Sequence, residues 1–146
     1  MLLAFLIGVI AGLRAMTAPA AVSWAAGLGW LDVSATWLAF LASPWTRWIF
    51  TILAIGELVN DQLPSTPSRT VPIQFGGRLV MGALSGAAIA GLSGSLLGIV
   101  GAVIGTLGGR ACRARLAATF GSDPPAAVIE DAVAIGGAAL IAMALR

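Results

Sequence analysis

No charged residue lies between Arg78 and Arg110, and this long apolar stretch is the feature that most limits how the chain can fold. The rest of the chain has the same character: 59% of its 146 residues are hydrophobic and 10% are charged, against about 45–50% and about 25% in soluble domains. A chain of this composition is expected to fold in a lipid bilayer, where helices satisfy their own backbone hydrogen bonds. The sequence therefore predicts an all-α integral membrane protein, organised as a single domain over residues 1–146.

The apolar segments predict a compact bundle of about five transmembrane helices, since about 20 residues cross a bilayer. The expected spans are residues 2–28, 45–63, 78–92, 96–116 and 124–145, with a tryptophan-containing interfacial segment at 33–43. Arg14, Thr17 and Pro19 interrupt the first span, and proline removes a backbone hydrogen bond, so this span is expected to be kinked. The stretch 91–95, GLSGS, is interpreted as a turn, because one helix running through it would be about 60 Å long and would not fit a bilayer.

The arginines are divided unevenly between the two sides of this predicted bundle. With five spans, the larger group lies on the side of the N-terminus and consists of Arg69, Arg78, Arg110, Arg113 and Arg115. The smaller group, on the other side, is Arg47 and Arg146. Because basic residues favour the cytoplasmic side, the sequence predicts a cytoplasmic N-terminus and a periplasmic C-terminus.

Several charged residues fall inside the predicted spans, where a charge at the bilayer centre costs about 2.5–3.5 kcal/mol. Such residues persist where they pair with one another or face water, so they mark a site. Glu57, Asn60 and Asp61 share one helical face, because residues three and four apart lie on the same side of a helix. In the predicted topology the charges gather in the cytoplasmic half of the membrane. The candidate solute- and proton-binding residues are Arg14, Glu57, Asn60, Asp61, Arg69, Arg78, Arg110, Glu130 and Asp131.

Glycines recur every four residues in two of the predicted spans. Gly82 and Gly86 begin one series, and Gly101, Gly105 and Gly109 form another. Small residues at this spacing let helix backbones approach closely. They predict glycine-zipper packing, either within one subunit or between the subunits of a homo-oligomer.

A weak internal similarity links residues 7–15 with residues 104–111, and each stretch is followed by a span that carries acids. In the predicted topology the two stretches run in opposite directions. Inverted repeats of this kind are common in transporters, where the substrate site lies between the repeats. The alternative is a chance match of small apolar residues.

Some stretches are more distinctive than the spans around them: GLRAMTAPA at 12–20, ELVNDQLPSTPSRT at 57–70, GGRLVMGALSGA at 76–87 and IEDAVAI at 129–135. Together they resemble a family of small bacterial inner-membrane proteins that carries only a domain-of-unknown-function label. The resemblance extends over nearly the whole chain, and the block at 57–70 is its most specific part. It implies a multi-span protein of the bacterial inner membrane and implies no substrate.

Three functions are consistent with these residues. The first is a small proton-linked transporter or channel-like protein, in which carboxylates carry protons and arginines hold a small anionic or zwitterionic solute. The second is a structural or lipid-binding membrane protein whose intramembrane charges are salt bridges. The third is a lipid-modifying enzyme in which the acid pairs Glu57/Asp61 and Glu130/Asp131 hold Mg²⁺. The chain has no histidine and no tyrosine, so it is not expected to be an enzyme, and no cofactor, metal or nucleic-acid partner is expected.

Overall fold

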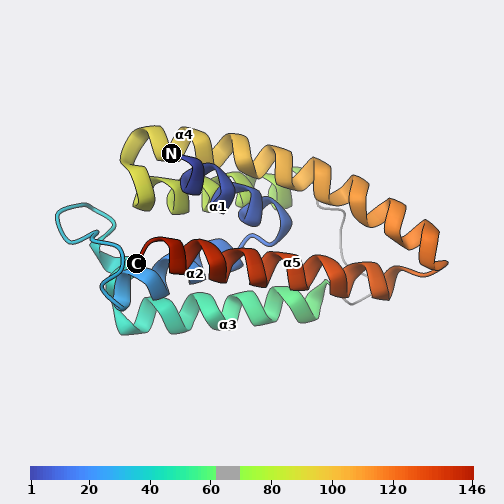
Figure 1. Ribbon diagram of the computed structural model, residues 1–146, viewed down its shortest axis with the longest axis horizontal. Coiled ribbons are helices and arrows are strands. Elements are labelled where there is room, and N and C mark those ends of the chain that lie inside the picture. Colours follow the sequence, from blue (N-terminus) through green and yellow to red (C-terminus); the bar gives the residue numbers. More distant parts are fainter. Residues whose placement is uncertain (62–69) are drawn as a thin grey trace.

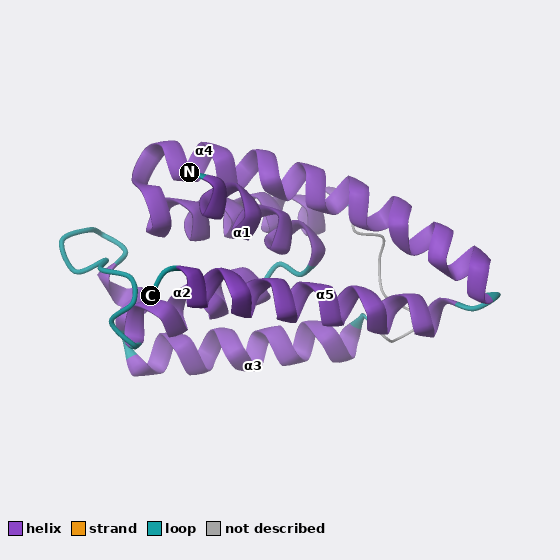
Figure 2. Cartoon of the chain, in the orientation of Figure 1, coloured by secondary structure: helices purple, strands orange, loops and turns teal. Residues whose placement is uncertain are grey.

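The computed structural model describes residues 1–61 and 70–146, which contain five α-helices, one short 3₁₀ helix and no strand, as Figure 2 shows. The helices are α1 (Leu2–Leu13), α2 (Thr17–Gly27), η1 (Ala39–Ala42, the 3₁₀ helix), α3 (Pro44–Asn60), α4 (Pro72–Phe120) and α5 (Asp123–Ala144). The predicted all-α fold is therefore confirmed. Two helices, α4 and α5, are long and apolar enough to cross a membrane, whereas α1 is apolar but has only 12 residues.

Proline and glycine set several of the helix boundaries. Pro44 begins α3, Pro72 begins α4, and Pro124 lies in the first turn of α5. Proline is favoured at this position because its missing N–H would have no partner within the helix. At the other end of α4, Gly121 adopts the left-handed conformation (φ 69°, ψ 7°) that commonly ends a helix.

The helix α4 reverses direction near its middle. Ala90 and Gly91 have non-helical backbone angles, and the positive φ of Gly91 (60°) is one that glycine adopts without strain. Gly82 lies against Gly98 and Gly86 against Gly94, so the first half of α4 (72–90) and the second half (91–120) are antiparallel. The reversal begins one residue before the predicted turn at 91–95.

The helix α1 leads to a tip formed by residues 14–16. The Ile10 side chain lies against Gly137 of α5, and Arg14 bonds Asp131, which comes earlier in α5. Successive residues of α1 therefore meet earlier and earlier residues of α5. It follows that α1 runs antiparallel to α5 and ends beside the middle of that helix.

The helix α2 runs back from this tip alongside α3. Met16 bonds Glu57 near the end of α3, and Trp24 donates a hydrogen bond to Thr51 (3.0 Å), so α2 and α3 are antiparallel. In Figure 1, α1 and α2 extend from the tip toward the same end of the bundle. The single kinked helix predicted over 2–28 is therefore wrong. Two helices, about 18 and 17 Å long, form a hairpin instead.

Helix backbones approach most closely where glycine faces glycine. A Cβ atom on Gly98 would lie within 3.0 Å of backbone atoms of Gly82, and one on Gly8 would lie equally close to Gly98. Gly101 and Gly105 meet the backbone of α1 in the same way. These contacts all lie within one chain, so the glycine series gives no separate support for a homo-oligomer, which stays a prediction.

The two stretches compared as an inverted repeat lie side by side and run in the same direction. Phe5 contacts Gly101 and Val9 contacts Gly105, so α1 is parallel to the second half of α4. An inverted repeat requires opposite directions. The expectation is therefore wrong for these stretches, because residues 2–28 traverse the bundle twice and so reverse the direction of every later helix.

The same extra traverse places both termini at one end of the bundle, beside the reversal of α4 (Figure 1). This differs from the prediction of termini on opposite sides. The loop between α2 and α3, which contains η1 and most of the predicted interfacial segment, lies at this end as well. In this loop Asp32 accepts hydrogen bonds from the hydroxyl and the backbone N–H of Ser34, and these bonds lower the pKa of Asp32.

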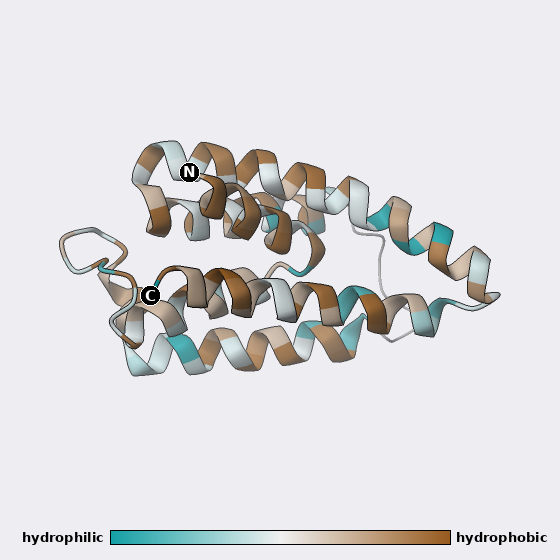
Figure 3. Ribbon diagram, in the orientation of Figure 1, coloured by the Kyte–Doolittle hydropathy of each residue, from teal (hydrophilic) through white to brown (hydrophobic). Residues whose placement is uncertain are grey.

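The outside of the bundle is apolar over most of its length. On α3 the exposed side chains include Ile49, Ile52, Ile55 and Val59. Figure 3 shows that the hydrophilic residues of α4 and α5 gather toward the end opposite the termini. The tip of the α1–α2 hairpin lies short of that end, about midway along the bundle (Figure 1).

Candidate functional site

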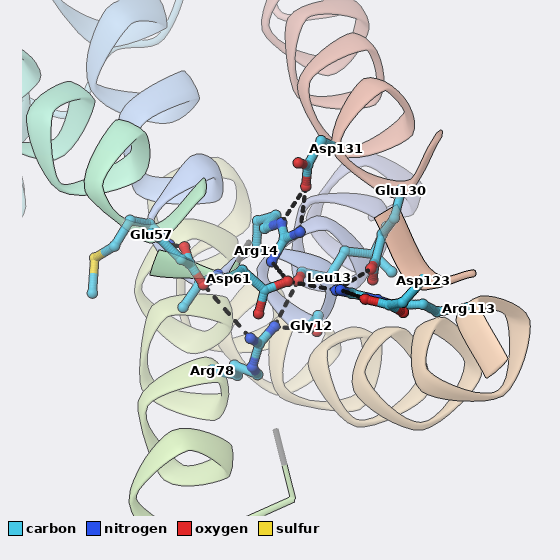
Figure 4. A network of polar contacts seen from close by, with 12 residues as sticks. Gly12, Leu13, Arg14, Glu57, Asp61, Arg78, Arg113, Asp123, Glu130 and Asp131 are labelled. Carbon is cyan, nitrogen blue, oxygen red and sulfur yellow. Dashed lines mark hydrogen bonds and ion pairs between the residues drawn. The ribbon is translucent and has the colours of Figure 1, made fainter. Parts of the chain in front are cut away.

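Charged side chains from α3, α4 and α5, or from their ends, meet Arg14 around the tip of the α1–α2 hairpin. We call this cluster the charged layer; its members are Arg14, Glu57, Asp61, Arg78, Arg113, Asp123, Glu130 and Asp131 (Figure 4). Six of them were predicted as site residues from the sequence. Arg113 and Asp123 were not.

Arg14 is the centre of the layer and is fully buried. Its guanidinium forms an ion pair with Asp61 at the end of α3 (Nη1 to Oδ2, 2.5 Å). Its Nε donates a hydrogen bond to Oδ1 of Asp131 on α5 (2.7 Å), and its Nη2 contacts the same oxygen. Arginine remains charged even when buried, so Arg14 is a fixed positive charge that joins α3 and α5.

Arg78 caps the end of α1. Its Nη1 donates hydrogen bonds to the carbonyl oxygens of Gly12 and Leu13, both at 2.7 Å, and the Thr106 hydroxyl donates a longer one to Gly12 (3.2 Å). The last carbonyls of a helix have no partner within the helix, and a positive charge is favourable beside them. Arg78 is almost fully buried, so these carbonyls are satisfied without water.

Glu57 has the opposite role at the start of α2. Its two carboxylate oxygens accept hydrogen bonds from the backbone N–H groups of Ala15 and Met16, both at 2.8 Å. A negative charge is favourable at this end of a helix. Glu57 also pairs with Arg78 (Oε1 to Nη2, 3.6 Å). The two helix ends at the tip are thus held by oppositely charged side chains that contact each other.

Arg113, near the end of α4, contacts three carboxylates. It pairs with Asp61 at 2.5 Å and Glu130 at 3.5 Å, and forms a two-point contact with Asp123 (2.9 and 2.5 Å). The prediction named Arg110 instead, and the structure places Arg110 outside the layer. Arg110 is exposed and bonds the Thr70 hydroxyl at 3.4 Å.

The rotation of α4 about its own axis explains why Arg113, and not Arg110, belongs to the charged layer. Each residue turns a helix by about 100°, so Arg113 lies about 80° from the buried Gly105, whereas Arg110 lies about 140° from it. Extending the glycine series along the helix would have favoured Arg113. Of the two remaining predicted residues, Asn60 is exposed on α3, and Arg69 lies outside the described residues.

A groove opens onto the charged layer between α3 and the first half of α4. Its volume is about 610 Å³. Its polar lining comes from Glu57, Asn60, Asp61, Gln74 and Arg78, while the hairpin tip and apolar residues of α3 and α4 complete the wall. Glu57 and Asp61 keep 18% and 11% of their side-chain surface exposed, so the groove reaches both carboxylates. Among the described residues no three His, Cys, Asp or Glu side chains converge as metal ligands.

The chain matches no protein-family model, no curated protein and no solved structure. The resemblance to small bacterial inner-membrane proteins of unknown function therefore stays a prediction. The geometry of the charged layer and of its groove is the basis for inferring a function.

Proposed function

We propose that this chain is a multi-pass protein of the bacterial inner membrane that moves a small anionic or zwitterionic solute together with protons. The observation that carries the proposal is the groove of about 610 Å³ at the tip of the α1–α2 hairpin. Its volume lies within the roughly 300–1,000 Å³ range of small-molecule sites. Interrupted helices occur inside membranes where they are buried in protein or line a water-filled cavity, and this hairpin tip is in such a place.

The proposed membrane arrangement uses α3, the two halves of α4, and α5 as spans. The helices α1 and α2 have 12 and 11 residues, fewer than the roughly 17 that the shortest spans need, so together they form a re-entrant hairpin that enters and leaves on one side. Close glycine contacts hold this hairpin against α4.

The arginines support one orientation of this arrangement. Arg47 lies near the start of α3 and Arg146 ends the chain, so both lie at the end that holds the termini, whereas the other described arginines lie toward the charged layer. The positive-inside rule then places the charged layer on the cytoplasmic side and both termini on the periplasmic side.

The groups that line the groove provide a way to couple solute binding to a proton. Glu57 holds two backbone N–H groups and contacts Arg78. A proton on Glu57 removes its negative charge and weakens all three contacts. Those donors then become available to the anionic group of a solute. In this scheme Arg78 binds the solute and Glu57 binds the proton.

Flux measurements in liposomes test the proposal. The purified protein is reconstituted around a pH-sensitive dye and challenged with gradients of single carboxylates, amino acids or phosphate. We expect at least one solute to drive proton movement in the wild-type protein, and we expect Glu57→Gln to abolish it because glutamine cannot carry the proton. Asp32→Asn is the control, since Asp32 is exposed and bonds Ser34 in a loop far from the groove. A wild-type protein that behaves like protein-free liposomes with every solute would contradict the proposal.

A structural role is the second candidate, and a specific observation favours it. Each charged member of the layer contacts an opposite charge, and Arg78 and Glu57 also cap helix ends. Such pairs specify how helices are arranged. Under this reading Glu57→Gln lowers the free energy of unfolding by about 1–2 kcal/mol, measured by denaturation in detergent, and the wild-type protein shows no solute-dependent flux.

A lipid-modifying enzyme has less support. The acids of the two pairs that would hold Mg²⁺ are turned toward arginines: Glu57 toward Arg78, Asp61 toward Arg14 and Arg113, and Glu130 and Asp131 toward Arg113 and Arg14. A cation at these acids would have to displace a guanidinium from each of them. The expectation that the chain is not an enzyme stays a prediction.

A further inference from the structure

A second groove, of about 370 Å³, lies on the other side of the charged layer, between α1, the second half of α4 and α5. Its lining is almost entirely apolar and includes Val9, Ile104, Leu116, Ile129 and Val133. Its residues on α4 extend from Ile104 to Leu116, a distance of about 18 Å along the helix. This groove is long and narrow and is unlike the polar groove at the hairpin tip.

Glycine gives this groove its depth. Gly105, Gly108 and Gly109 line it from α4. A Cβ atom added to Gly108 would meet no atom within 4 Å, so the space above this residue is open. By contrast, Gly105 is closed off by the backbone of Val9 in α1. The groove therefore begins where α1 ends its contact with α4.

The charged residues that line the groove, Arg113 and Glu130, are paired with each other, whereas Arg115, which directly precedes the lining residue Leu116, has no carboxylate partner within the described part of the chain. Arg113 is already paired with Asp61, Asp123 and Glu130. Arg115 is exposed and forms no ion pair with a described carboxylate. Seven residues separate it from Gly108, which places the two within about 20° on the helix.

Arg110 provides a natural comparison on the same helix. It too is exposed, but it lies about 160° from Gly108 and contacts Thr70 on the far side of α4. Of the two exposed arginines, only Arg115 is on the side of the groove.

The depth of Arg115 in the bilayer follows from the length of α4. In the orientation proposed above, the second half of α4 enters the membrane at Gly91, and about 20 residues cross the roughly 30 Å hydrocarbon core. The helix therefore leaves the core at about Cys112. Arg115 lies about 5 Å further, at the level of the phosphate groups of the cytoplasmic leaflet.

We propose that this groove binds an anionic phospholipid of the cytoplasmic leaflet, with one acyl chain along the glycine-lined floor and the phosphate on Arg115. The apolar wall suits the acyl chain, and the guanidinium suits the phosphate oxygens. Glu130 also borders the groove, but its pairing with Arg113 compensates its charge. Anionic lipids are concentrated in this leaflet and attract basic side chains near the surface. The site uses the same orientation as the transport proposal and does not depend on transport.

Native mass spectrometry of the purified protein in neutral detergent tests this site, using equal amounts of phosphatidylglycerol and phosphatidylcholine with identical chains. The wild-type protein is expected to retain phosphatidylglycerol about fivefold better, the preference that one arginine confers at an anionic surface. Arg115→Gln is expected to bring the ratio close to one. Arg110→Gln, with the same change in charge on the opposite face, is expected to keep the wild-type ratio.

A second pair of variants tests the groove itself. Gly108→Leu fills the open space above the helix and is expected to lower the retention of both lipids. Gly136→Leu, at another open glycine that does not line the groove, is expected to leave retention unchanged. Equal retention of the two lipids by the wild-type protein would overturn the proposal. So would equal losses in Arg115→Gln and Arg110→Gln, or unchanged retention in Gly108→Leu.

Discussion

Arg14→Met is expected to lower the free energy of unfolding by about 3–5 kcal/mol, because it removes the buried positive charge that two carboxylates of the layer contact. Arg14 is fully buried, and Asp61 and Asp131 both contact its guanidinium. Methionine has a similar length and fills much of the same space, so the decrease in the free energy of unfolding measures the effect of removing the charge. Unfolding of the purified protein in mixed detergent, followed by circular dichroism, measures it.

Two further variants show whether the pairing is the cause. Arg115→Met removes an arginine from an exposed position on α4, and we expect a change within about 0.5 kcal/mol. Adding Asp131→Asn to Arg14→Met removes one of the negative charges that Arg14 compensated and is expected to restore part of the lost stability. If Arg14→Met were no more harmful than Arg115→Met, the charged layer would not hold the hairpin in place.

The second large effect is expected at a glycine. Gly98→Ala adds one methyl group where the backbones of Gly82 and Gly86 leave no space. Overpacking of this kind costs about 1–3 kcal/mol, and here the methyl group must separate the two antiparallel halves of α4 at a backbone contact, so we expect a loss near the upper limit. The same unfolding measurement in detergent applies.

Gly108→Ala in the same helix is the matched substitution, since its Cβ atom would meet open space. Alanine is a better helix former than glycine by about 1 kcal/mol, so this variant is expected to be as stable as the wild-type protein or more stable. The two substitutions are chemically identical, but we expect them to change the free energy of unfolding in opposite directions. A similar effect of both would show that close packing around Gly98 is not what stabilises the bundle.

The helical class of the fold could be predicted from the sequence, but the path of the first 28 residues could not. Arg14, Thr17 and Pro19 correctly marked an interruption. Whether the chain continues or reverses at such a point depends on what holds the two helix ends. Here Glu57 and Arg78 form hydrogen bonds with these helix ends, and both residues belong to helices that come much later in the chain. No local pattern encodes these contacts, so the sequence predicted a kink where the structure has a hairpin.

The candidate site shows the same division between local and distant information. A charge in an apolar segment is a local signal, and it identified Arg14, Asp61 and Asp131, which the structure brings together. The choice between Arg110 and Arg113 depends on how α4 is rotated against α1. That rotation is set by glycine contacts between helices about 90 residues apart in the chain, which a count of charges does not include.

The hairpin also implies an order of assembly during synthesis. The tip is made first, yet Asp131, which bonds Arg14, is 117 residues further along the chain. At about 5–20 residues per second, the ribosome delivers this partner roughly 6–23 s after Arg14. Until then the guanidinium of Arg14 lacks part of its compensation, and an uncompensated charge is unfavourable in lipid. In the proposed membrane arrangement, the α1–α2 hairpin is therefore expected to reach its final depth only after α5 has been made.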